Sequence, residues 1–214
     1  MHGAFQPRTF ARATWLLALL ALGLAPGSAV ALPAGGGDAV RGFYDTLMST
    51  MKDGPALGQS GRYAKLEPVV RNTFDLPLMA RLAVGPTWTS LSEGLQQQVT
   101  EAFGRYISAI YADRFDNYSG EQLQVAGEQA VAAGVIVHSR IVKADGEPVS
   151  IDYLMRRNAG GWQISDVYLD GTISELATRR SEFAAILRRE GIEGLIANLN
   201  RKAELLTGRA AQPS

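Results

Sequence analysis

The hydrophobic pattern of this chain changes its period twice, and this limits the possible folds more than any other feature. Before about residue 120 and after about residue 172, apolar residues recur every three or four positions, as on one face of a helix. Between these points the apolar residues alternate with polar ones, which is typical of half-buried strands. The alternating stretches are residues 122–131, 134–143, 149–157 and 162–170. Helices, then strands, then helices indicate the α+β fold class.

The connections between the expected strands are short and contain turn residues, such as Asp145-Gly146 and the Asn158–Gly161 segment. Short connections join antiparallel neighbours, so the sequence predicts a four-stranded antiparallel meander sheet. Helices from both the N-terminal and the C-terminal parts should cover one face of it. The expected helices are residues 38–52, 61–74 with a kink near Pro68, 75–85, 93–117, 173–189 and 192–206. Such a fold either fills the space under the sheet or leaves a pocket there.

The first 31 residues have the features of a secretory signal peptide. Arg8 and Arg12 precede an apolar run of about 11 residues, which is too short to span a bilayer, and the segment ends in the small-residue pattern up to Ala31. We therefore expect export, with cleavage near Ala31. Residues 32–207 should form a single domain, followed by a flexible tail at 208–214.

Composition excludes several classes of function. The chain has no cysteine, which rules out thiol chemistry and cysteine metal sites. Without the two arginines of the leader, 19 basic residues face 21 acidic ones, a net charge of −2 that does not suggest a nucleic-acid-binding protein. No carboxylate cluster, phosphate-binding glycine loop or nucleophile elbow is recognisable, so no metal or cofactor is expected.

A catalytic interpretation depends on one histidine. His138 lies in the second expected strand and could act as a base with Asp152 or Asp166 on neighbouring strands, as in small α+β enzymes that move protons inside an apolar pocket. A half-exposed histidine without a chemical role explains the same pattern. The enzyme hypothesis therefore needs these three side chains to converge on a pocket.

Arg180 is placed unusually. The apolar face of the expected helix 173–189 reads Ile173, Leu176, Ala177, Arg180, Phe183, Ala184 and Leu187. A charge on such a face must extend outward, pair with an acid, or meet an anionic ligand, since a buried unpaired charge is very costly. Asp166 and Asp170 are the candidate acids, and a ligand head group is the alternative.

The order and spacing of many residues along the mature chain resemble a known family. The pattern is Phe74-Asp75, Met79-Ala80, Gly85, Trp88, Gln98, Phe103, Tyr111, Tyr118, Gly120, Tyr153, Gly161-Trp162, Asp166-Val167, Gly171, Ile173-Ser174, Arg180 and Phe183. It is similar to the periplasmic lipid-binding proteins of the MlaC and toluene-tolerance (Ttg) type, with its strongest likeness to the hopanoid-associated HpnM branch. Arg179 departs from the tyrosine that usually stands there, which leaves the lipid head group open.

The resemblance implies a non-enzymatic periplasmic lipid carrier, in which lipid tails enter an apolar pocket between sheet and helices. It further implies a phospholipid or hopanoid ligand, a monomeric protein, and transfer between inner and outer membranes with an inner-membrane MCE/ABC transport complex and an outer-membrane component. The expected ligand-binding residues are Phe74, Leu78, Met79, Leu82, Phe103, Tyr106, Ile110, Ile151, Tyr153, Ile164, Val167 and Arg180.

Two other classes fit the sequence. One is a small periplasmic enzyme with a pocket like that of ketosteroid isomerase, built on His138, Asp152 and Asp166. The other is a structural adaptor, in which the same apolar residues fill the core and the outer surface binds a membrane complex. A pocket lined by apolar side chains would favour the carrier over both.

Overall fold

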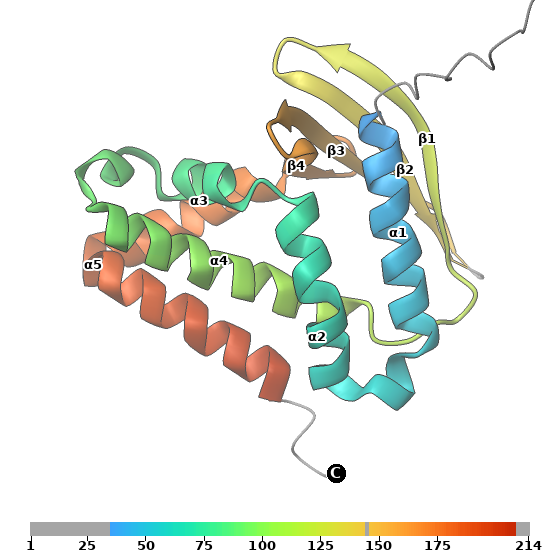
Figure 1. Ribbon diagram of the computed structural model, residues 1–214, viewed down its shortest axis with the longest axis horizontal. Coiled ribbons are helices and arrows are strands. Elements are labelled where there is room, and N and C mark those ends of the chain that lie inside the picture. Colours follow the sequence, from blue (N-terminus) through green and yellow to red (C-terminus); the bar gives the residue numbers. More distant parts are fainter. Residues whose placement is uncertain (1–34, 144–145, 209–214) are drawn as a thin grey trace, which may run out of the picture. The chain divides into compact units, whose positions relative to one another are not determined.

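The chain forms a helical layer and one antiparallel sheet (Figure 1). A computed structural model describes residues 35–143 and 146–208. The expected signal peptide, residues 1–31, and nearly all of the expected tail lie outside the described residues. The helices are α1 (Gly36–Lys52), α2 (Gly54–Thr73), α3 (Leu76–Val84), the short 3-10 helix η1 (Gly85–Ser90), α4 (Glu93–Arg114) and α5 (Glu175–Gly208).

The sheet has five strands in the order β1-β2-β3-β4-β5, each antiparallel to its neighbours. They are β1 (Gln122–Val131), β2 (Gly134–Val142), β3 (Val149–Asn158), β4 (Gly161–Leu169) and β5 (Ile173–Ser174). The prediction of four strands was therefore wrong by one. The added strand has two residues, which is too short to show an alternating pattern.

β5 forms because the chain turns sharply after β4. Asp170 and Gly171 both have positive φ angles, 50° and 71°, and this turn brings Ser174 beside Tyr168. The segment that the sequence assigned to the first turn of a helix is therefore a strand, and α5 begins only at Glu175. Ile173, the first residue of the expected apolar face, therefore lies outside the helix.

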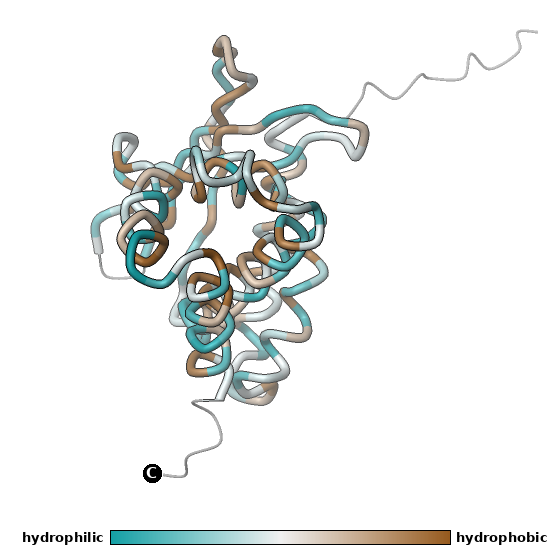
Figure 2. The backbone as a smooth tube through the Cα atoms, turned by 90° about the vertical axis from the view of Figure 1, so that its left-hand side faces the viewer, coloured by the Kyte–Doolittle hydropathy of each residue, from teal (hydrophilic) through white to brown (hydrophobic). Residues whose placement is uncertain are grey.

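The helices cover one face of the sheet. α1 lies against β1 and β2, whereas α3 and α5 contact β4 (Figure 1). α4 packs mainly on other helices, namely α2, α3 and α5. Apolar and hydrophilic residues alternate around the turns of these helices (Figure 2), as expected for helices that bury one side and expose the other.

The junction between α2 and α3 is fastened to the sheet. Phe74 forms a parallel bridge with Ile164 of β4, and the Asp75 amide donates to the Ile164 carbonyl over 2.9 Å. The Asp75 carboxylate accepts a hydrogen bond of 3.2 Å from the Leu78 amide, which caps the start of α3. This junction holds the Phe74 ring under the sheet.

Two helices break at glycines. Gly58 in α2 and Gly191 in α5 have φ angles of 60° and 69° with extended ψ, a conformation that only glycine adopts readily. The break at Gly191 was predicted. The predicted break near Pro68 was wrong in its position, because the helical backbone of α2 continues through Pro68 and departs from helical geometry at Gly58.

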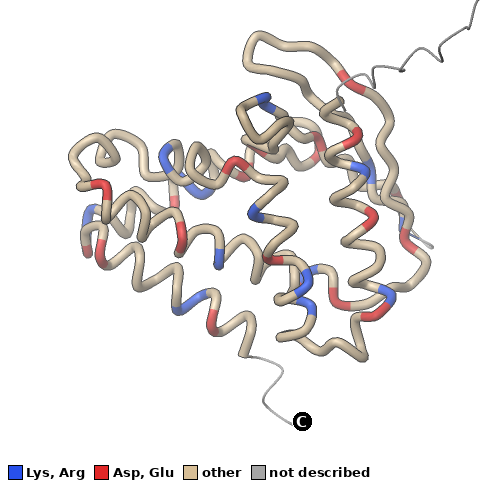
Figure 3. Tube along the Cα trace, in the orientation of Figure 1, with Lys and Arg blue, Asp and Glu red and all other residues tan. Residues whose placement is uncertain are grey.

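Acidic and basic residues are interspersed along the helices (Figure 3). Within residues 35–143 and 146–208, no three potential ligands gather as a metal site would require. The same stretches contain no helix with the length and apolar character that a bilayer span demands.

Candidate functional site

A cavity of about 300 Å³ lies between the sheet and the helices. It is bounded by β2, β3 and β4 on one side and by α3, α4 and α5 with the α2–α3 junction on the other. The lining is Phe74, Met79, Phe103, Ile107, Ile110, Tyr111, Arg114, Phe115, Ile141, Val149, Ile151, Tyr153, Val167, Leu169, Glu175, Leu176 and Arg179. Apart from three charged residues and two tyrosines, every lining residue is apolar, as in sites for small apolar ligands.

The sheet wall follows from strand alternation. Tyr153 stands opposite Val167, and Ile151 stands opposite Leu169, so four side chains of β3 and β4 point into the cavity. The pairing shifts by one residue after Leu154, where Ser165 is the extra residue on β4. Beyond this bulge Ile164 is fully buried under the α2–α3 junction, so it supports the wall without lining it.

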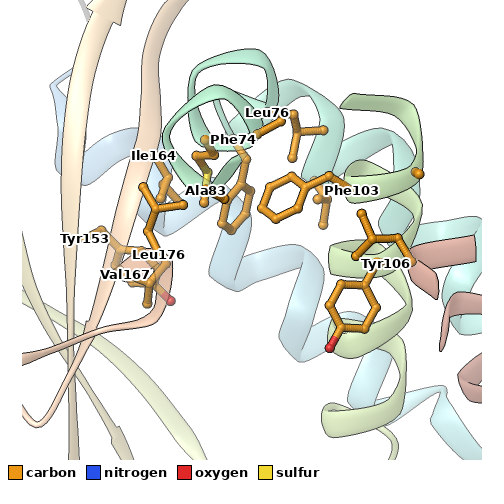
Figure 4. Close-up of a cluster of buried hydrophobic side chains, with 14 of the residues drawn as sticks. Phe74, Leu76, Ala83, Phe103, Tyr106, Tyr153, Ile164, Val167 and Leu176 are labelled. Carbon is orange, nitrogen blue, oxygen red and sulfur yellow. The ribbon is translucent and has the colours of Figure 1, made fainter. Parts of the chain in front are cut away.

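The opposite wall is one face of α4. Phe103, Ile107, Ile110, Tyr111 and Arg114 recur at helical spacing and all line the cavity. Two aromatic rings of the lining lie against each other: Phe74 is 5.5 Å from Tyr111, centroid to centroid. Figure 4 shows Tyr153 and Val167 on the strand side, Phe103 on the helix side, and Phe74 between them.

A charged group borders the cavity at the start of α5. The Arg179 guanidinium lies 3.2 Å from the Glu175 carboxylate and 3.0 Å from that of Glu182, and it stacks over the Tyr106 ring at 5.6 Å. Its side chain is only 13% exposed. Two carboxylates therefore surround this cation, as a buried charge requires. Arg114, by contrast, is exposed at the cavity edge and forms no ion pair with any described residue.

Two tyrosines line the cavity and a third lies behind them. Tyr111 and Tyr153 line the cavity, and Tyr44 lies behind them with its ring 5.9 Å from that of Tyr153. Burial raises the pKa of Tyr153 well above its ordinary value, and burial also raises the pKa values of Tyr111 and Tyr44. All three hydroxyls are therefore protonated at neutral pH.

The structure separates the expected ligand-binding residues into two groups. Those that line the cavity are Phe74, Met79, Phe103, Ile110, Ile151, Tyr153 and Val167. Those that do not are Leu78, Leu82, Tyr106, Ile164 and Arg180. Leu82 is 39% exposed, whereas Ile164 is fully buried. Contact with a ligand remains a prediction for both groups.

Arg180 is not on the buried face of α5, and that expectation was wrong. Leu176, Phe183 and Ile186 are buried, and this spacing puts Arg179 on the inner face while Arg180 is exposed. Ile173, on which the expected face was built, belongs to β5 and is 53% exposed. Arg180 instead lies beside Gly85, in a surface depression that includes Leu82.

Asp166 does not pair with Arg180 either. Its carboxylate accepts hydrogen bonds from the Ser174 hydroxyl at 2.7 Å, the Val167 amide at 2.7 Å and the Leu176 amide at 3.2 Å. It therefore fastens the start of α5 to β4, which is a structural role for a buried carboxylate.

Several lining residues were missed. Val149 and Leu169 extend the alternation of Ile151 and Val167 by two positions, so strand periodicity could have identified them. Ile107 and Tyr111 follow Phe103 at helical spacing and were also accessible to pattern reasoning. Arg179 was not accessible in this way, because a charged residue does not follow the apolar pattern that identifies a buried helix face.

The three residues of the enzyme hypothesis do not border the cavity. His138 is 40% exposed, and its Nδ1 lies 3.1 Å from the Asp152 carboxylate. These residues alternate with the inward-facing Ser139 and Ile151, so they lie on the other face of the sheet. The histidine and the apolar cavity therefore do not form one site.

An α+β domain of this kind, with one apolar cavity described between sheet and helices, fits the class of proteins that enclose an apolar ligand. Residues 41–201 match the family model described as MlaC protein, and the chain belongs to that family.

Two known proteins are similar to the chain. The MlaC binding protein of an intermembrane phospholipid transport system from Haemophilus influenzae is 25% identical over 147 residues, which are 64% of this chain and 68% of that protein. The structure of a phospholipid-binding protein from Ralstonia solanacearum, solved in complex with a phospholipid, superposes with a TM-score of 0.67 at 25% identity. That match covers 81% of this chain and 99% of the other.

Proposed function

We propose that this protein is a lipid carrier that shelters hydrocarbon tails in the cavity between its sheet and helices. The observation that carries the proposal is the apolar lining of a 300 Å³ space that the protein's own side chains leave open. Membership of the MlaC family supports it, as does the likeness to a protein solved with a phospholipid.

The volume sets how much lipid the cavity takes in this conformation. Because an apolar cavity of about 150 Å³ holds one benzene, a cavity of 300 Å³ holds about twelve carbons. At about 0.8 kcal/mol per methylene, sheltering them contributes on the order of 10 kcal/mol. Two sixteen-carbon chains contain about 30 methylenes, so a diacyl lipid requires the walls to move apart or the chains to be covered in another way.

The proposal includes a place and partners. The resemblance to MlaC proteins supports a periplasmic location after cleavage near Ala31, and transfer between the two membranes with an MCE/ABC complex of the inner membrane and an outer-membrane component. A phospholipid is the first cargo to test, since the similar Ralstonia protein was solved with one. The HpnM-like pattern makes a hopanoid the second.

Native mass spectrometry of the protein purified from cells tests the function. We expect a bound mass of one lipid, whose fragmentation distinguishes a phospholipid from a hopanoid. Val167→Trp should reduce the bound lipid several-fold, because the indole enters the cavity from β4. Leu154→Trp is the matched control, because Leu154 lies on the other face of the adjacent strand β3.

Two results would contradict the carrier. One is a protein that is empty after purification and takes up no phospholipid from vesicles. The other is equal lipid content in Val167→Trp, Leu154→Trp and the unchanged chain, which would place the lipid outside this cavity.

A further inference from the structure

The charged residues of the cavity lining differ in how well the protein itself neutralises them. They are Arg114, Glu175 and Arg179. Arg179 lies 3.2 Å from the Glu175 carboxylate and 3.0 Å from that of Glu182, and its side chain is 13% exposed. This buried cation already has two anionic partners, so the anion of a ligand would gain little from it.

Arg114 has neither feature. None of the salt bridges among residues 35–143 and 146–208 involves it. Among the described residues that line the cavity, Arg114 alone is exposed, whereas the others are buried or half-buried. Arg114 therefore marks the place where the apolar space meets solvent.

The end of α4 holds Arg114 at this edge. Tyr111 and Phe115 both line the cavity, and their rings stack with 5.7 Å between centroids and 16° between planes. The Phe115 amide donates to the Tyr111 carbonyl over 3.0 Å, which closes the last turn of the helix. A cation in this turn also interacts favourably with the helix end, but that interaction does not require its side chain to line a cavity.

The size of the cavity keeps a lipid head group at the same edge. A space for about twelve carbons is filled by part of one tail. A charged head group cannot follow the tail into an apolar lining, because burying a charge without partners is very costly. The head group must therefore stay where the lining is exposed, which is beside Arg114.

We propose that Arg114 binds the anionic head group, a phosphate or a carboxylate, of a lipid whose tail occupies the cavity. The inference rests on the proposed function and assigns its head-group site, which sequence reasoning placed at Arg180. A guanidinium donates paired hydrogen bonds to either anion, and its exposure keeps the gain in affinity modest. A lipid without an anion gains nothing from Arg114.

Three probes with the same tail test the inference: dodecanoate, 1-dodecanol and dodecyltrimethylammonium. Their affinities are measured by displacement of N-phenyl-1-naphthylamine, an uncharged fluorophore, from the delipidated full chain at neutral pH. Arg114→Gln should weaken dodecanoate about fivefold and leave 1-dodecanol unchanged. Arg201→Gln is the matched control, because Arg201 is exposed on α5 and does not line the cavity. It should leave both probes unchanged.

Reversal of the charge separates binding from a structural role. Arg114→Glu should make dodecyltrimethylammonium bind more tightly than dodecanoate, whereas damage to the fold would weaken all three probes alike. In the unchanged protein, added salt should reduce the affinity for dodecanoate and leave that for 1-dodecanol as it is, since an exposed ion pair is screened. A melting curve of each variant verifies folding.

Two further ligands identify the source of the anion. A lysophosphatidylglycerol with a lauroyl tail carries a phosphodiester, and a larger loss for it than for dodecanoate in Arg114→Gln would identify phosphate as the preferred head group. Inorganic phosphate should not displace the fluorophore, because it has no tail. Displacement by inorganic phosphate would put the anion inside the cavity and overturn the head-group site.

The inference and the proposed function fail in different ways. Equal loss of dodecanoate and 1-dodecanol in Arg114→Gln, or no loss of either, overturns the role of Arg114 while leaving the carrier intact. Failure of every probe, 1-dodecanol included, and of phospholipid to bind the unchanged chain overturns the proposed function itself.

Discussion

Arg179 and Arg180 are neighbours in sequence with opposite surroundings. Arg179 is 13% exposed and lies between the carboxylates of Glu175 and Glu182, whereas Arg180 is exposed and makes no ion pair with another described residue. Removing the Arg179 charge leaves two partly buried carboxylates without their cation. Removing the Arg180 charge changes only the surface.

We therefore expect Arg179→Met to lower the free energy of unfolding by about 1–3 kcal/mol, and Arg180→Met to change it by less than about 0.5 kcal/mol. Urea denaturation of both variants measures the difference. Equal effects would mean that the ion pairs of Arg179 contribute nothing measurable. Lipid content of the Arg180 variant also tests its predicted contact with a head group.

The buried tyrosines make the protein sensitive to alkali. Burial raises the pKa values of Tyr44, Tyr111 and Tyr153 above the ordinary value of about 10. Their contribution to stability is fully present below pH 10 and is lost as the pH rises above it, because the unfolded tyrosines release protons first. Above pH 10, each of the three tyrosines lowers the free energy of unfolding by up to about 1.4 kcal/mol per pH unit.

The double variant Tyr111→Phe/Tyr153→Phe should show a shallower loss of stability between pH 10 and the onset of unfolding. Urea denaturation at a series of alkaline pH values measures the slope. Tyr118→Phe, which removes a ring that is 38% exposed, should keep the original slope. Identical slopes in all three proteins would contradict a role for the buried hydroxyls.

Sequence reasoning located much of the cavity wall but not its charged edge. Phe103 and Ile110 follow the helical period of α4, and Ile151 and Val167 follow the strand alternation. The structure puts all four in the lining. Arg179 could not be found in this way. The expected face was built on Ile173 and Ala177, which are exposed in the structure. Phe183 and Ile186 are buried, and Arg179 lies on their side of the helix.

At the scale of elements, glycines decide where helices break. Gly191 divides α5 with φ 69° and ψ −168°, a conformation that strains any residue with a Cβ atom, although the space around it is open. Gly42 lies on the exposed side of α1, with no neighbouring atom where a Cβ would stand. Replacement by alanine should therefore change the free energy of unfolding in opposite directions at the two glycines.

Gly191→Ala should lower the free energy of unfolding by about 1–2 kcal/mol, because of backbone strain. Gly42→Ala should raise it by about 0.5–1 kcal/mol, because alanine is the better helix former. Thermal unfolding of both variants distinguishes them by sign. Destabilisation by Gly42→Ala, or none by Gly191→Ala, would contradict the assigned backbone geometry.

The long elements were predictable and the short ones were not. Four strands and most helical segments show clear periodicity in the sequence, and their positions agree with the structure to within a few residues. The helix break in α2 was misplaced because Pro68 is a stronger sequence signal than Gly58, yet the backbone keeps helical dihedral angles at the proline. Tertiary contacts, which single positions do not reveal, decide such cases.

At the scale of the whole molecule, the open cavity couples stability to cargo. A ligand that binds only the folded chain raises the apparent unfolding free energy by about 4 kcal/mol at a thousandfold excess over its dissociation constant. Delipidated protein should therefore melt at a lower temperature than protein purified with lipid, and phospholipid vesicles should restore the difference. Coincident melting curves at saturating lipid would argue against binding to the folded chain.

The attachments to β4 make the two sides of the cavity unequal. Phe74 and Asp75 hold the α2–α3 junction to that strand by backbone contacts, and Asp166 holds the start of α5. α4 instead packs mainly on other helices, namely α2, α3 and α5. A bulky guest would then gain room by pushing α4 outward while the sheet stays still, so amide exchange should quicken in α4 first when a two-tailed lipid enters or leaves.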